Sequence, residues 1–83
     1  MRYSFNFDFY GKIFKGTFTF NGNADTVYDK INEYSKSKNV YFLRKTRDSD
    51  AIFKYIQDKL YIDLGVVLDL DEETVETIKI VFR

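Results

Sequence analysis

The sequence predicts an α+β fold, in which an N-terminal β-hairpin and further strands build a mixed or antiparallel sheet and a helix packs on one face. Three observations support this prediction. Apolar and polar residues alternate over residues 2–20, apolar residues return at helical spacing after residue 23, and β-branched residues dominate residues 74–83. The chain has 83 residues, of which 45% are hydrophobic and 31% charged. That length and composition fit one compact α+β domain spanning residues 1–83.

The first twenty residues predict an amphipathic hairpin. Rings occupy alternate positions, and Gly11-Lys12 between the two runs suits a two-residue type II′ turn. Such a turn pairs Phe9 with Phe14 and Asp8 with Lys15, so that the rings share one face and the polar side chains the other. We therefore expect the phenylalanine rings to be buried beneath a helix. The alternating rings are Tyr3, Phe5, Phe7, Phe9, Phe14, Phe18 and Phe20.

A helix is predicted next along the chain. Asn23 or Asp25 can cap its N-terminus, because both side chains accept hydrogen bonds from free main-chain N–H groups. Val27, Ile31 and Tyr34 recur at the spacing of one helical face. That face would lie against the rings of the hairpin.

The middle of the chain predicts a strand, followed by an element that two structures fit. Residues 40–43 read Val-Tyr-Phe-Leu, which favours a strand. Ile52, Ile56 and Leu60 have helical spacing, so that residues 51–60 favour a short second helix. The same segment has apolar residues on both faces and also fits a strand.

The last part of the chain predicts a C-terminal hairpin. Alternation from residue 60 to residue 70 indicates its first strand, with a bulge at Gly65. The β-branched side chains of residues 74–83 favour the closing strand, although the spacing of Val75 and Ile78 also fits a helix.

Hairpin, helix and then strands is the order of β-grasp and related α+β folds, in which a helix crosses one face of a mixed sheet. The run Phe14-Lys15-Gly16-Thr17-Phe18 and the helix after it resemble the corresponding part of the immunoglobulin-binding domain of protein L, over less than half of the chain. This resemblance implies architecture and no function.

The residue types that are missing exclude several chemistries. The chain has no cysteine, histidine or proline. Without cysteine there is no disulfide, thiol nucleophile or thiolate metal site, and without histidine there is no Ser-His-Asp machinery or imidazole ligand. The four glycines are too far apart for a phosphate-binding loop. We therefore expect a protein that is not an enzyme and that uses no cofactor and no metal.

Apolar runs in this chain are short. None of them reaches the length of a secretory signal or a membrane span, which makes a soluble cytoplasmic protein without membrane contact the expectation. Its richness in Phe, Tyr, Ile, Asn, Lys and Asp is typical of AT-rich genomes. This composition points to a phage, a virus or a low-GC microbe as the source, and the small size fits a phage or virus.

Candidate binding residues are a basic cluster and two tyrosines. Arg44, Lys45 and Arg47 follow a predicted strand, where loops often carry function. Tyr41 and Tyr55 tolerate contact with water through their hydroxyl groups, and tyrosine is enriched at protein interfaces. The alternative for the cluster is a solvated turn neutralised by the aspartates that follow it.

These observations favour a small non-enzymatic interaction protein that binds a protein partner, with a phage- or virus-encoded modulator of a host protein as one setting. The alternative is a nucleic-acid-binding module that uses the basic cluster at residues 44–47. The balance of 13 basic and 13 acidic residues argues against general nucleic-acid binding. A homodimer formed through an unpaired edge strand is the third expectation.

Overall fold

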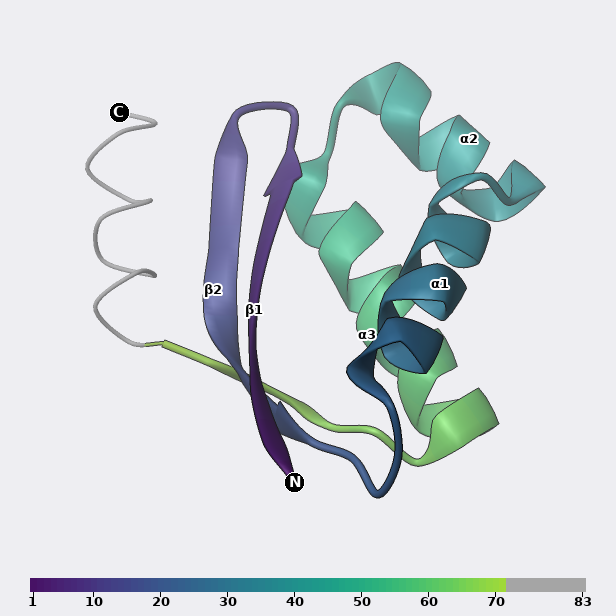
Figure 1. Cartoon of the computed structure of the whole chain (residues 1–83). Coiled ribbons are helices and arrows are strands. Elements are labelled where there is room, and N and C mark those ends of the chain that lie inside the picture. The colour runs from purple at the N-terminus through teal and green to yellow at the C-terminus, as the bar shows by residue number, and fades with distance from the viewer. Residues whose placement is uncertain (72–83) are drawn as a thin grey trace.

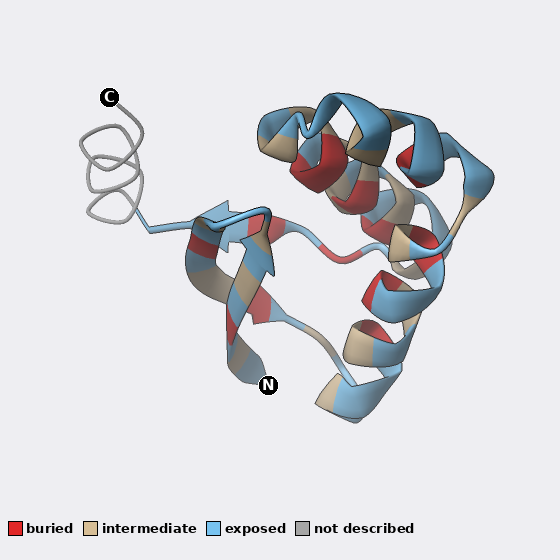
Figure 2. Ribbon diagram, turned by 90° about the horizontal axis from the view of Figure 1, so that it is seen from above, coloured by how far each residue is buried: buried red, intermediate tan, exposed pale blue. Residues whose placement is uncertain are grey.

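A computed structural model of the chain describes residues 1–71 (Figure 1). It confirms the α+β class, because an antiparallel sheet forms one layer and the helices stand together on one side of it. Figure 2 shows the buried residues gathered where the helices face one another and the sheet. The described elements are β1 (Arg2–Phe9), β2 (Lys12–Thr19), α1 (Ala24–Ser35), α2 (Lys38–Thr46), α3 (Ser49–Leu64) and β3 (Leu68–Leu70).

The sheet has β2 at its centre among the described strands, with β1 and β3 antiparallel on either side. These strands therefore form an antiparallel sheet and not the mixed sheet of the β-grasp order. β3 is paired through Phe18 opposite Leu68 and Gly16 opposite Leu70. The predicted closing strand of a C-terminal hairpin, residues 74–83, lies outside the described residues.

The hairpin forms as predicted, but its turn and register differ from the prediction. The turn residues are Tyr10 and Gly11, both with positive φ, which is the pattern of a type I′ turn. Phe9 consequently pairs with Lys12, and Phe7 pairs with Phe14. Moving the turn by one residue shifts the pairing by two, and an even shift leaves every side chain on its predicted face.

Most of the ring face is covered by the helical layer. Phe5, Phe14 and Phe18 are buried, and Phe14 stacks on Phe53 of α3 with ring centroids 4.3 Å apart. Phe7 and Phe9, which were also expected to be buried, are only half-buried. The core is therefore densest towards β2, and the β1 side of the ring face is more open.

Gly16 allows β2 and β3 to approach closely. A Cβ atom at this position would overlap the carbonyl oxygen of Asp69 on β3 and crowd the ring of Phe5. A larger residue would force the two strands apart, so the third strand depends on the absence of a side chain here.

α1 agrees with the prediction. Its N-cap is Asn23, whose Oδ1 accepts the N–H of Asp25 at 2.9 Å. Val27, Ile31 and Tyr34 are buried on the face predicted for the core.

The predicted strand at residues 40–43 is wrong, because this segment lies inside α2. Ser37 begins the helix by accepting the N–H of Val40 on its hydroxyl oxygen. Val40 is then buried and Leu43, one turn later, is half-buried against the core. Four strand-forming residues are too few to separate the two structures by periodicity, and here the cap and the tertiary burial decide for a helix.

The predicted short helix at residues 51–60 is confirmed as part of the longer α3. Asp48 caps it by accepting the N–H of Ala51, and Gly65 ends it in the left-handed conformation with φ +68°. Residues 60–64 were expected in a strand and instead complete this helix. Gly65 is a helix C-cap and not a β-bulge.

Candidate functional site

Four of the five predicted binding residues lie on α2 or at its C-terminal end. Tyr41, Arg44 and Lys45 belong to the helix, and Arg47 caps it with a left-handed φ of 56°. Because the segment is helical, these residues do not form one loop cluster. Tyr55, the fifth residue, belongs to α3.

The outer face of α2 carries two exposed rings flanked by cations. We use this name for Lys38, Tyr41, Phe42 and Lys45, which share one side of the helix by their spacing. Tyr41 is 51% exposed and Phe42 66% exposed, and their ring centroids lie 6.1 Å apart in an edge-to-face arrangement. The Nζ atom of Lys45 lies 4.8 Å from the centroid of the Tyr41 ring, within the range of a cation–π contact.

Phe42 was missed by sequence reasoning. Its position within Val40-Tyr41-Phe42-Leu43 suggested a strand with two buried faces, so no exposed ring was expected there. On a helix, Phe42 falls opposite the buried Val40 face. If residues 38–46 had been assigned to a helix, helical spacing would have placed Phe42 on the exposed side.

The sequence segment that contains α2 carries only positive charges. Residues 34–47 contain five lysines and arginines and no acidic residue. The two aspartates that follow are engaged elsewhere: Asp48 caps α3, and Asp50 pairs with Lys12 at 2.6 Å. Among the described residues, no ion pair joins Arg44, Lys45 or Arg47 to a carboxylate.

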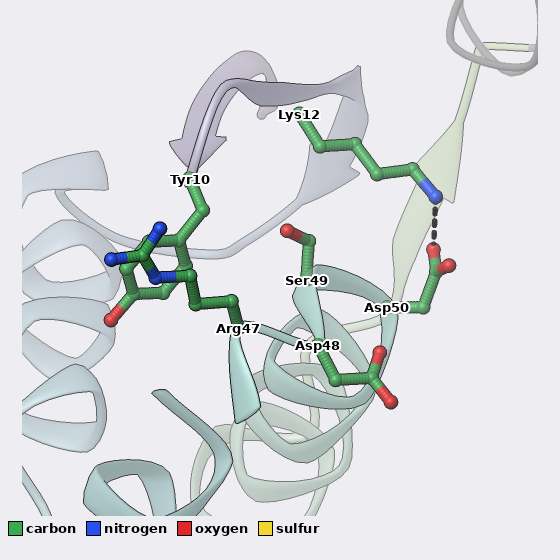
Figure 3. A pocket seen from close by; sticks show the side chains of 6 residues that line it. All are labelled: Tyr10, Lys12, Arg47, Asp48, Ser49 and Asp50. Carbon is green, nitrogen blue, oxygen red and sulfur yellow. Dashed lines mark hydrogen bonds and ion pairs between the residues drawn. The ribbon is translucent and has the colours of Figure 1, made fainter. Parts of the chain in front are cut away.

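A shallow cavity of about 510 Å³ lies between the hairpin turn and the start of α3 (Figure 3). Lys12 forms its ion pair with Asp50 here, and Ser49 donates a hydrogen bond of 2.6 Å to the carbonyl oxygen of Phe9. Arg47 and Asp48 also contribute to the lining, so that cations and carboxylates balance. These contacts fasten the hairpin tip to the helical layer.

A second hollow, which we call the β1 groove, runs between strand β1 and the helices. It has a volume of about 470 Å³, and Asn6 and Asp8 of β1, Asn32 of α1 and Arg44 of α2 contribute to its lining. Arg44 therefore turns away from the outer face of α2 and into this groove. Its Nε–H is buried without a hydrogen-bond acceptor.

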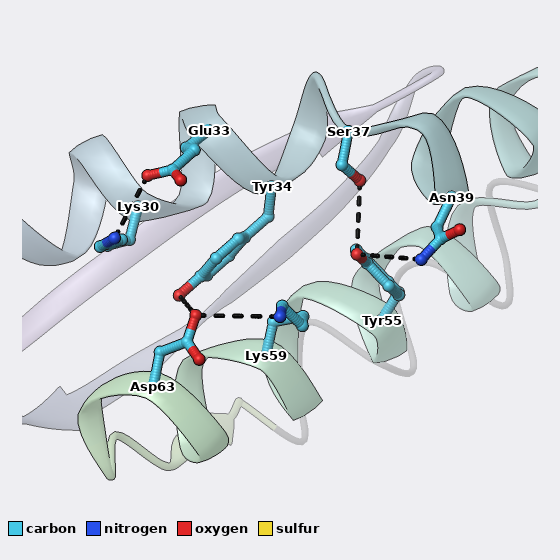
Figure 4. A network of polar contacts seen from close by, with 8 residues as sticks. All are labelled: Lys30, Glu33, Tyr34, Ser37, Asn39, Tyr55, Lys59 and Asp63. Atoms are coloured by element: carbon cyan, nitrogen blue, oxygen red, sulfur yellow. Dashed lines mark hydrogen bonds and ion pairs between the residues drawn. The ribbon is translucent and has the colours of Figure 1, made fainter.

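Tyr55 is part of a polar network that joins α3 to the other helices (Figure 4). Its hydroxyl oxygen accepts hydrogen bonds from Ser37 at 3.4 Å and Asn39 at 3.5 Å, at the N-terminal end of α2. The hydrogen bond from Ser37 lowers the pKa of Tyr55. The structure thus places Tyr55 at the opposite end of α2 from Arg44 and Arg47, in a half-buried position.

Tyr34 anchors α1 to α3 through a second group of polar contacts, also drawn in Figure 4. Its hydroxyl donates a hydrogen bond of 2.6 Å to the carboxylate of Asp63, which also lies 3.9 Å from Lys59. Burial, together with this carboxylate, raises the pKa of Tyr34 well above its ordinary value. Tyr34 therefore holds α1 against α3, and Tyr55 holds α3 against the N-terminal end of α2.

Neither metal-binding clusters nor membrane-spanning helices occur in residues 1–71: no three acidic side chains gather as a metal site requires, and every helix there is too short or too polar to cross a bilayer. No protein-family model matches the chain, and no curated protein or solved structure gives a significant match.

Proposed function

We propose that the chain is a non-enzymatic interaction module that binds a protein partner through the outer face of α2. The observation that carries this proposal is the pair of exposed rings, Tyr41 and Phe42. Neighbouring aromatic rings left in water at the centre of a helix face supply the kind of anchor that dominates protein–protein binding energy.

The partner that fits this face is an acidic protein surface with an apolar centre. Lys38 and Lys45 flank the rings, and no acidic residue lies on α2 to repel such a partner. Rim charges of this kind accelerate association and select the partner, while the buried rings hold the complex. We therefore expect association to slow as the salt concentration rises, with a smaller effect on dissociation.

A binding site for single-stranded nucleic acid is the second candidate. The contact of Lys45 with the Tyr41 ring favours it, because stacking rings beside cations are the elements of such sites. The neutral formal charge and a sequence pI near 6.2 act against it. In addition, Arg44 lines the β1 groove and is not part of the ring face.

The test compares two double variants in affinity capture from an extract of the cells in which the protein is made. Tyr41→Ala/Phe42→Ala removes the proposed anchor. Tyr61→Ala/Ile62→Ala is the matched control, since these residues form another exposed apolar pair, on α3. Quantitative mass spectrometry should show one protein lost with the α2 variant and retained with the control. Equal retention by both variants would contradict the proposal.

Nucleic-acid binding is measured separately with labelled single-stranded DNA and RNA. Under the protein-partner proposal, neither oligonucleotide binds even at low salt. Under the second candidate, the logarithm of the affinity falls by about 0.7 per phosphate contact for each tenfold rise in salt concentration. Lys45→Ala should then weaken binding and reduce that slope.

A further inference from the structure

The pairing of β1 with β2 determines which main-chain groups of β1 point out of the sheet. Met1 and Phe20 exchange two hydrogen bonds, of 3.0 and 3.1 Å. In an antiparallel ladder such pairs alternate, so the odd-numbered residues of β1 bond to β2. The even-numbered residues Ser4, Asn6 and Asp8 therefore direct their N–H and C=O groups away from β2.

One part of this edge is covered and another is open. At Ser4, the hydroxyl of Tyr28 on α1 donates a hydrogen bond of 2.9 Å to the main-chain carbonyl. At Asn6 and Asp8, no residue among 1–71 bonds to the outward main-chain groups. Both of these residues contribute to the lining of the β1 groove. The groove therefore lies beside a short stretch of strand with unused donors and acceptors.

Arg44 gives this groove its charge preference. Within the described part of the chain, its guanidinium has no ion pair, and its Nε–H is removed from water without an acceptor. An unsatisfied buried donor is unfavourable, and a carboxylate that pairs with the guanidinium through Nε and one terminal nitrogen would remove that cost. The carboxylate of Asp8 accepts the N–H of Gly11 at 2.8 Å in the turn, and no ion pair among the described residues joins it to Arg44.

We propose that the β1 groove binds an extended segment of a partner protein, which adds to the sheet at Asn6 and Asp8 and places a glutamate or aspartate side chain on Arg44. Main-chain hydrogen bonds to a sheet edge provide affinity in this mode, and side chains in the adjacent groove provide selectivity. The surface is distinct from the outer face of α2, and either could exist without the other.

The probe is a capped eight-residue peptide of alternating threonine and valine with one glutamate at its centre, and its twin carries glutamine instead. Titration followed by NMR should shift the amide signals of Asn6 and Asp8 and slow their exchange with solvent. The glutamate peptide should bind at least fivefold more tightly than the glutamine peptide. In Arg44→Gln this preference should disappear, whereas Tyr41→Ala/Phe42→Ala should retain it.

Two versions of the peptide test the edge itself. In each, alternate main-chain nitrogens are methylated, so that one edge of the peptide cannot pair. One version should lose binding and the other should keep it. On the protein side, Asn6→Pro removes an outward donor without breaking the ladder to β2 and should abolish binding. Ser4→Pro is the matched control at the covered part of the edge and should leave binding unchanged.

Three results would overturn the proposal. The first is protection of the Asn6 and Asp8 amides from exchange in the free monomer, which would mean that the edge is already occupied. The second is a dimer that Asn6→Pro dissociates, since a second copy would then fill the edge. The third is the loss of either peptide contrast on the unmodified protein. This means equal binding of the two methylated peptides, or equal binding of the glutamate and glutamine peptides.

Discussion

The molecule keeps two groups of aromatic rings in opposite environments. In the core, Phe14 stacks on Phe53 at 4.3 Å and Phe18 has no exposed surface. On α2, the ring centroids of Tyr41 and Phe42 lie 6.1 Å apart, and both residues keep more than half of their surfaces in water. Burial of a ring stabilises the fold, while an exposed ring contributes little until a partner covers it. The aromatic residues of this small chain therefore divide into a buried group that stabilises the fold and an exposed group, which we propose binds a partner.

The largest expected effect tests the buried group. Phe18→Ala should lower the free energy of unfolding by about 3–5 kcal/mol, the usual range for emptying a buried ring site. Small domains have total stabilities of only about 5 kcal/mol or somewhat more, so this variant should be close to unfolded. Urea denaturation followed by circular dichroism measures the change. A loss below about 1 kcal/mol would show that Phe18 is not in the core.

A smaller effect on the free energy of unfolding is expected when a tyrosine hydroxyl is removed, and it should be larger for a buried hydroxyl than for an exposed one. Tyr34→Phe removes the hydrogen bond to Asp63 and should cost about 1–2 kcal/mol, because bonds to charged groups are stronger than neutral ones. Tyr41→Phe should stay within about 0.5 kcal/mol of the unmodified protein, as surface substitutions do. Denaturant titrations at pH 7 give both values. Equal costs for the two variants would contradict the network in Figure 4.

The pH dependence of stability sharpens the same comparison. The pKa of Tyr34 is raised in the folded state, so above about pH 10 the unfolded chain releases this proton while the folded chain keeps it. The stability difference between the unmodified protein and Tyr34→Phe should therefore shrink as the pH rises above 10. Chemical denaturation at a series of pH values measures it. A constant difference would contradict the raised pKa.

The contribution of Tyr55 to stability should change with pH in the opposite direction. Its pKa is lowered in the folded state, so the folded chain releases the proton before the unfolded chain does. The stability difference between the unmodified protein and Tyr55→Phe should grow as the pH rises through the lowered pKa towards 10. The same titration series measures both tyrosines, and slopes of equal sign would contradict the two assignments.

The smallest expected effect on stability tests the exposed group. Phe42→Ala should change the free energy of unfolding by less than about 0.5 kcal/mol, because little area is buried and alanine has the higher helix propensity. Capture of the partner should nevertheless be lost. A destabilisation of several kcal/mol would show that Phe42 belongs to the core.

Much of the fold was predictable because its apolar patterns are long. Alternation over the hairpin fixed which rings face the helices, and the spacing of Val27, Ile31 and Tyr34 predicted α1 with its cap. The register was wrong because a two-residue turn fits Gly11 at either central position. Tyr10 takes a left-handed conformation that glycine or asparagine adopts more readily, and local sequence gave no reason to expect it.

The candidate site was predictable only in part. Residues 40–43 form too short a run to separate strand from helix, so the exposure of Phe42 was missed. Tyr41 and Lys45 were selected for their chemistry and lie together on the outer face of α2. Arg44 was selected for the same surface, but it lines a groove made by α1, α2, α3 and β1. Such a groove depends on tertiary packing, which no local pattern contains.

The position of β3 has a consequence for the order in which the sheet is completed. β1 and β2 are joined by a short turn and pair locally. By contrast, the pairing of β2 with β3 brings together Phe18 and Leu68, which are about fifty positions apart in the chain. During synthesis the hairpin can close as soon as it emerges, whereas β3 emerges only after α1, α2 and α3 have been made. We therefore expect the second edge of β2 to be the last part of the described sheet to be protected in a newly made chain. Until then that edge is open to wrong partners, and this places the aggregation risk of the nascent chain at Gly16 and its neighbours.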